Sequence, residues 1–166
     1  MRRPLMFLVL AVGCSTRAPA GDRMTLDGVG FEVPSSWRRA DTHMRGVTTS
    51  VFTPEENPAH ESLTIIRTQR GVPVAHGSEA DVLRLLATAE SLPGAQTRPA
   101  TPITTNHGMR GARVDLDYVP PGQSQSYHRV HVVVLDGDAL VHVLYTAQTP
   151  DADAIALVLS TLHHEA

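Results

Sequence analysis

Alternation of apolar and polar side chains predicts several short strands along this chain. From Val29 to Val33 the pattern alternates, and it stops at Pro34, which cannot donate a backbone hydrogen bond within a sheet. Residues 46–53 and 62–69 are rich in β-branched side chains and are separated by the turn-forming sequence PEENP. These segments predict three strands in the first half of the chain.

A fourth strand is predicted over residues 112–118, where apolar and charged residues alternate strictly. Arg113, Asp115 and Asp117 share one face of this strand. Two aspartates on one face resemble a general acid–base pair, but Arg113 on the same face favours a solvated charge pattern. We therefore interpret this face as exposed.

Residues 127–135 and 139–147 predict a β-hairpin, because they flank an Asp-Gly-Asp sequence at 136–138 that suits a tight type I′ turn. If Asp136 and Gly137 form a two-residue loop, His131 lies directly opposite His142, with Cβ atoms ~5 Å apart. A three-residue loop instead places the two histidines on opposite faces. Both registers are open at the level of sequence.

Two helices are predicted from spacing and caps. The first begins with Ser78 as its cap and ends before Pro93, with apolar residues at helical intervals at Val82, Leu85, Leu86 and Ala89. The second begins at Thr149-Pro150, with proline in the first helical position. Its apolar stripe consists of Ile155, Val158, Leu159 and Leu162.

Together these elements predict an α+β fold, an antiparallel sheet of about six strands packed with two helices in a single domain over residues 25–166. The order of elements resembles the PsbP-like sandwich. The resemblance is carried by GFEVPSSW (30–37), NHGMRGARVDLDY (106–118) and the terminal hairpin with its helix. It implies a fold and no activity, because one fold hosts many functions.

The N-terminal segment has the pattern of a signal peptide. Arg2 and Arg3 precede a short apolar run over residues 5–12, and Gly13 stands just before Cys14, the only cysteine. The apolar run is too short to cross ~30 Å of hydrocarbon as a helix. The sequence LAVGC (10–14) resembles the lipobox of bacterial lipoproteins, although alanine stands where that motif most often has leucine.

This resemblance implies that residues 1–13 are removed and that Cys14 carries the acyl chains of a membrane anchor. Residues 14–24 then form a lipidated tether. Two or more acyl chains give stable membrane attachment. Ser15 differs from the aspartate that resembles an inner-membrane retention signal, so the periplasmic face of the outer membrane is the favoured location.

Composition excludes some classes of function. The net charge is −3, the fourteen cationic side chains are all arginine, and they are scattered. Nucleic-acid binding needs a concentrated cationic surface, so no nucleic-acid partner is predicted. We find no GxSxG, SxxK, GxGxxG or P-loop motif, and lipidation would consume the only thiol, so neither an enzyme nor a cofactor is predicted.

Nine histidines raise the question of a metal site. His131 and His142 are the candidate ligands, but zinc sites use three or four protein ligands and no HExxH motif supplies the others. The favoured function is therefore a lipid-anchored envelope module without catalytic activity, which binds an envelope protein or assists its assembly. The alternative is a periplasmic carrier of a small ligand or a metal.

Overall fold

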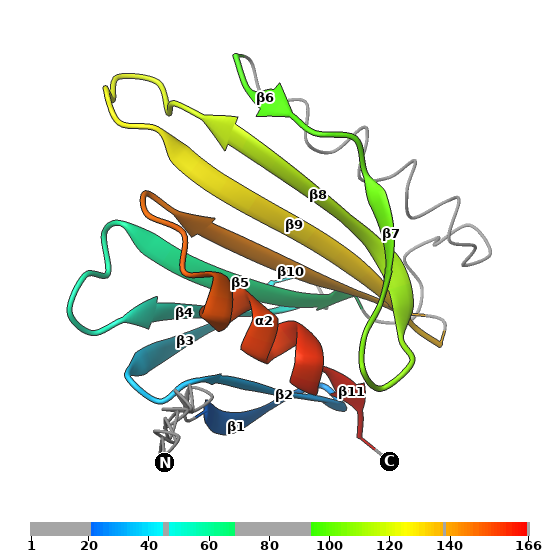
Figure 1. The fold of residues 1–166 in the computed structure, drawn as a ribbon. Helices are drawn as coiled ribbons and strands as arrows, with labels where there is room; N and C mark the ends of the chain where they lie inside the picture. The colour runs from blue at the N-terminus through cyan, green and yellow to red at the C-terminus, as the bar shows by residue number, and fades with distance from the viewer. Residues whose placement is uncertain (1–20, 45–46, 69–93, 138, 166) are drawn as a thin grey trace, which may run out of the picture.

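The computed structural model describes residues 21–44, 47–68, 94–137 and 139–165, which form two antiparallel sheets and a helix (Figure 1). The main sheet has the strand order β3-β4-β5-β10-β9-β8-β6, and β7 also pairs with β8. The small sheet has the order β1-β2-β11. The elements are β1 (Gly21–Leu26), β2 (Val29–Pro34), β3 (Trp37–Met44), β4 (Val47–Pro54), β5 (Glu61–Thr68), β6 (Gln96–Thr97), β7 (Thr101–Thr104), β8 (Arg110–Tyr118), β9 (Tyr127–Asp136), β10 (Ala139–Ala147), α2 (Ala152–Thr161) and β11 (His163–His164).

The predicted α+β sandwich of about six strands and two helices is wrong. The described residues contain eleven strands in two sheets, and α2 is the single helix among them. Six of the strands, β2, β4, β5, β8, β9 and β10, lie where alternation or β-branched runs predicted them. The helix predicted between Ser78 and Pro93 lies outside the described residues.

The strands that were not predicted from the sequence lack an alternating pattern of apolar and polar residues. Seven of the eight residues of β3 are exposed, because β3 is an edge strand of the main sheet and most of its surface faces solvent. The strands β6, β7 and β11 have only two to four residues each, too few to show a period. β1 begins at Gly21, so strand structure includes residues 21–24, which were expected to be tether.

The start of α2 also differs from the prediction, which placed its cap at Thr149-Pro150. Asp151 is the N-cap, and its carboxylate accepts hydrogen bonds from the backbone N–H groups of Asp153 and Ala154. A carboxylate at this position satisfies unpaired N–H groups and interacts favourably with the helix dipole.

The hydrophobic core lies between one face of the main sheet, here called the inner face, and the layer formed by α2 with the small sheet (Figure 1). Phe31 of β2 packs edge-on against Phe52 of β4, with ring centroids 5.8 Å apart. The helix contributes Ile155, Val158 and the following Leu162. A smaller cluster on the outer face contains Ala112, Val114, Val133 and Leu140.

Candidate functional site

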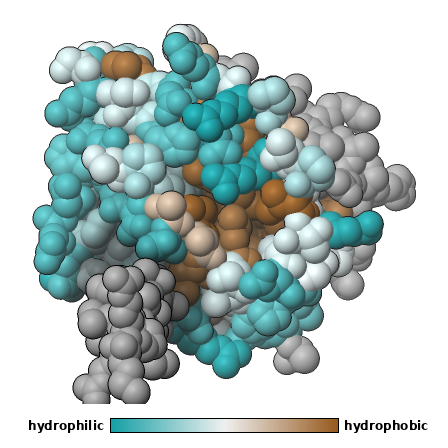
Figure 2. Space-filling model, viewed as in Figure 1, coloured by the Kyte–Doolittle hydropathy of each residue, from teal (hydrophilic) through white to brown (hydrophobic). Residues whose placement is uncertain are grey.

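A groove runs along α2, where the helix lies over the inner face of the main sheet. Two adjoining cavities of about 180 and 270 Å³ form it, and both are lined by Arg113, Ala156 and Leu159. Figure 2 shows apolar surface in a hollow at this part of the molecule, bordered by polar side chains. We call it the α2 groove. Its other lining residues are Ile103, Thr104, Thr105, Asn106, His128, Val130, Tyr145, Pro150, Asp151, Ala152, Ile155 and Ser160.

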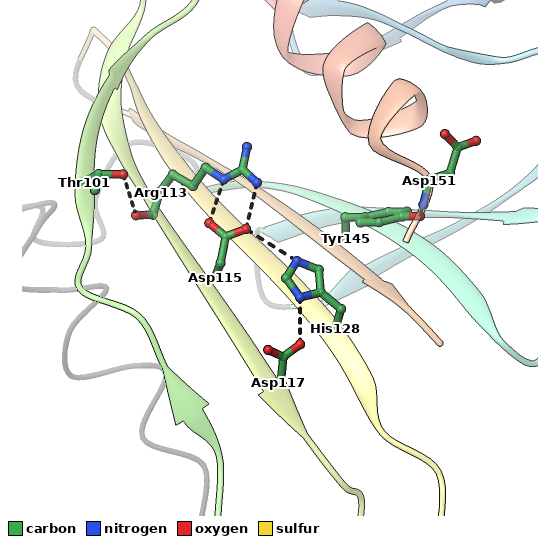
Figure 3. A network of polar contacts seen from close by, with 7 residues as sticks. All are labelled: Thr101, Arg113, Asp115, Asp117, His128, Tyr145 and Asp151. Carbon is green, nitrogen blue, oxygen red and sulfur yellow. Dashed lines mark hydrogen bonds and ion pairs between the residues drawn. The ribbon is translucent and has the colours of Figure 1, made fainter. Parts of the chain in front are cut away.

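A polar network lies beside the α2 groove on β8 and β9 (Figure 3). The Arg113 guanidinium donates two hydrogen bonds to the Asp115 carboxylate, at 2.8 and 2.7 Å. His128 lies between two carboxylates, with Nδ1 2.9 Å from Asp117 and Nε2 3.4 Å from Asp115. The antiparallel register places His128 directly opposite Asp117 on the inner face.

The interpretation of this face as solvated holds only in part: 34% of the Arg113 side chain and 44% of the Asp117 side chain are exposed. Arg113, Asp115 and Asp117 do share a face, but it is the inner one, and only 17% of the Asp115 side chain is exposed. The sequence could not show that β9 would bring His128 to these aspartates, because the contact depends on register. The alternating charges on residues 113–117 were the available signal.

The electrostatics of the Arg113–Asp115 pair favour the charged forms of both side chains. The Arg113 guanidinium lowers the pKa of the Asp115 carboxyl, against the opposing effect of burial, and Asp115 in turn raises the pKa of Arg113. Both ring nitrogens of His128 face carboxylates. The imidazole therefore has no nitrogen directed away from these partners to accept a proton from a substrate.

A second polar contact joins the groove to the start of α2. The Tyr145 hydroxyl donates to Glu61 Oε1. It also accepts a hydrogen bond of 2.7 Å from the backbone N–H of Asp151 (Figure 3). Burial, together with the hydrogen bond to Glu61, raises the pKa of Tyr145. The hydrogen bond from Asp151 holds the first residues of α2 over the sheet. The raised pKa keeps the Tyr145 hydroxyl protonated at neutral pH.

The predicted histidine pair lies on the outer face of the main sheet. His131 Nε2 is 3.2 Å from His142 Nδ1. The two residues are diagonal neighbours, because His131 pairs with Leu144 and His142 with Val133; direct opposition is therefore wrong. Burial is the main cause that lowers the pKa of His142 to about 4. Across the described ranges, no group of three histidine, cysteine, aspartate or glutamate side chains could hold a metal ion.

Cys14, the predicted lipid attachment site, lies outside the described residues. Within the part of the chain that the structure describes, no helix is both long and apolar enough to cross a bilayer.

Comparison with known proteins gives similarity at the level of fold. No family model and no curated protein sequence matches the chain. Among solved structures, the chain is similar to a Bacteroides thetaiotaomicron protein (13% identity, TM-score 0.59), covering 84% of this chain but only 46% of that one. A protein of unknown function from Pseudomonas aeruginosa, PA94, a putative regulator, has 16% identity and a TM-score of 0.46 over 76% of this chain and 82% of its own.

The solution structure of cyanobacterial PsbP (CyanoP) from Synechocystis sp. PCC 6803 is similar over nearly the whole of both chains. The match covers 94% of this chain and 98% of that one, with 18% identity and a TM-score of 0.55. At this identity the likeness concerns architecture alone. The chain therefore has a PsbP-like fold, as the resemblance of its sequence segments predicted.

Proposed function

We propose that this protein is a lipid-anchored, non-catalytic binding module of the cell envelope, and that apolar side chains of an envelope protein partner occupy the α2 groove. The observation that carries the proposal is an apolar hollow beside a polar border in which Arg113 and His128 are already held by carboxylates. Arg113 is bonded to Asp115, and His128 is bonded to Asp117.

The apolar lining decides the class of occupant. A charged group would lose its hydration against the apolar side chains of the groove, which offer it no hydrogen bond in return. An apolar side chain gains from contact with Ile103, Val130 and Leu159 without breaking any of the border contacts. The chemistry of the α2 groove therefore favours neutral, apolar groups.

The absence of catalytic equipment in the groove supports a binding role. Its lining contains no cysteine, and its histidine directs both nitrogens at carboxylates. The neighbours with TM-scores above 0.5 are a PsbP protein and a Bacteroides protein whose description states no activity.

The anchor part of the proposal rests on the sequence over residues 2–14. Six residues, 15–20, separate Cys14 from the start of β1 at Gly21. Six residues span at most about 20 Å when fully extended. A lipid on Cys14 would therefore hold the domain close to the membrane surface, where its partner would be another envelope component.

The binding role is tested in living cells by photocrosslinking from a residue that lines the groove. A photoreactive residue at the exposed Asn106, at the edge of the groove, is expected to give a specific protein adduct. Ala156→Arg is expected to abolish this adduct, because Ala156 is exposed on α2 and lines both cavities, so the change blocks the groove without opening the core.

The matched control places the same photoreactive residue at the exposed Thr42 of β3, on the far edge of the main sheet. An adduct that forms equally from Thr42, or that persists in Ala156→Arg, would contradict the groove as the binding surface.

A second candidate function, a metal carrier, is favoured by the adjacent rings of His131 and His142. The two imidazoles supply two of the three or four protein ligands that zinc sites use, so this candidate ranks second. Tight zinc or copper binding that is lost in both His131→Ala and His142→Ala would support it. Unchanged affinity in the two variants would eliminate it.

A further inference from the structure

A third cavity, of about 460 Å³, lies away from the α2 groove at the turn between β9 and β10. We call it the turn cavity. It is within the size range of pockets that bind small molecules. Its lining combines polar and apolar residues: Arg67, His107, Gly108, Met109, Leu135, Asp136, Gly137, Ala139 and His164.

The polar side of the turn cavity is built around a buried carboxylate. Only 5% of the Asp136 side chain is exposed. Arg67 donates to its Oδ2 through Nε at 2.9 Å and Nη2 at 2.7 Å, and His164 Nδ1 lies 2.9 Å from its Oδ1. Both oxygens of Asp136 are therefore engaged by protein donors.

This arrangement leaves hydrogen-bond donors in excess. A guanidinium carries five N–H groups, and the bonds to Asp136 use two of them. Within the described ranges the Arg67 side chain makes no other hydrogen bond, and only 19% of it is exposed. The ring of His107 stacks on His163, with centroids 5.2 Å apart, and its nitrogens have no hydrogen-bond partner among the described residues.

We propose that the turn cavity binds a small organic carboxylate, whose oxygens accept from the remaining N–H groups of Arg67 and from His107. The planar guanidinium matches a carboxylate, and charge-assisted bonds of this kind are stronger than neutral ones. Asp136 holds the guanidinium in place rather than competing for it, since both of its oxygens are already bonded. Met109, Leu135 and Ala139 line the same cavity and suit a short aliphatic chain.

The test uses the folded domain and four probes at constant ionic strength: butyrate, acetate, inorganic phosphate and the neutral analogue butyramide. Binding is followed by backbone amide shifts in NMR titrations. Butyrate is expected to give saturable shifts confined to residues 107–109 and 135–139, with weaker binding of acetate and none of butyramide. Equal binding of butyramide, or tighter binding of phosphate than of butyrate, would overturn the carboxylate assignment.

Variants then test the named contacts. Arg67→Gln is expected to weaken butyrate binding about tenfold or more, because a charge-assisted pair is lost. His107 is exposed, so His107→Ala leaves the core intact and is expected to weaken binding several-fold. Arg38→Gln, on β3 and paired with Glu55 at the surface, is the control and should bind as the unaltered protein does.

Loss of Arg67 leaves Asp136 buried without its cation, so the double variant Arg67→Gln/Asp136→Asn provides a second form without the charge pair. Butyrate binding that is unchanged in His107→Ala and in a folded form lacking Arg67 would overturn the proposal. So would the absence of saturable shifts in the unaltered protein. The variant Ala156→Arg should leave butyrate binding unchanged, which separates this site from the α2 groove.

Discussion

His142 illustrates how position in a sheet sets the chemistry of a single side chain. It is mostly buried on the outer face of β10, and burial lowers its pKa to about 4. In the unfolded chain histidine takes up a proton near pH 6.5. Between these values the unfolded state binds more protons, so lowering the pH favours unfolding.

We therefore expect the free energy of unfolding to be highest above pH 6.5 and to fall as the pH decreases toward 4. The shift corresponds to a loss of about 3 kcal/mol for this residue. Urea unfolding midpoints at several pH values measure the effect. His142→Gln should flatten the acid dependence, while His43→Gln, at an exposed position of β3, should not. An identical pH profile in His142→Gln would show that other groups cause the acid sensitivity.

The histidine pair also shows how far residue-level prediction reaches. Strand alternation correctly places both histidines on one face under a two-residue loop, but the loop consists of residues 137 and 138, because Asp136 pairs with Ala139. Asp136 belongs to the strand, where Arg67 and His164 bind its carboxylate. These partners lie far away in the sequence, so local turn propensity cannot reveal them.

At the scale of elements, the pairing of β8 with β9 depends on a close backbone approach at Gly111. A Cβ added to Gly111 would lie 2.0 Å from the carbonyl oxygen of Val133, which is backbone and cannot rotate away. We expect Gly111→Ala to separate the two strands and to lower the free energy of unfolding by about 1–3 kcal/mol or more. Chemical denaturation measures the change.

The matched control for this prediction is Gly21→Ala in β1. A Cβ there would lie 2.9 Å from Glu32 Oε2 and 3.0 Å from Leu157 Cδ2, which are ends of flexible side chains, and 3.0 Å from Glu32 Cβ, a much milder approach than the one at Gly111. Its effect should be clearly smaller. Equal destabilisation by the two changes would contradict the view that backbone contact at Gly111 limits the spacing of β8 and β9.

Elements were predictable where one face is buried and the other is not. β8 and β10 show this alternation in their burial as well as in their sequence. β3 lacks this alternation because both of its faces are largely exposed. The strand conformation of β11 depends on its pairing with β2 rather than on a pattern in its own two residues. The α2 groove follows from the placement of α2 over the sheet, so neither its outline nor the contact of His128 with Asp117 has a local signature.

At the scale of the whole molecule, the proposed function separates attachment from binding. The α2 groove and the turn cavity are built from residues after Gly21, whereas the proposed anchor is Cys14. Changes in one part should therefore leave the other unaffected. The Ala156→Arg protein should still fractionate with membranes although its groove is blocked.

The converse change, Cys14→Ser, should release the protein from the membrane or leave it with an uncleaved N-terminus, because a hydroxyl cannot form the thioether to diacylglycerol. Membrane fractionation and mass spectrometry of the N-terminus measure the outcome, and Ser15→Ala is the control that keeps the thiol. Since acyl chains supply the membrane affinity, the released domain should retain its NMR titration with butyrate. A membrane-bound form that keeps Met1 and an unmodified Cys14 would show that attachment does not use this cysteine.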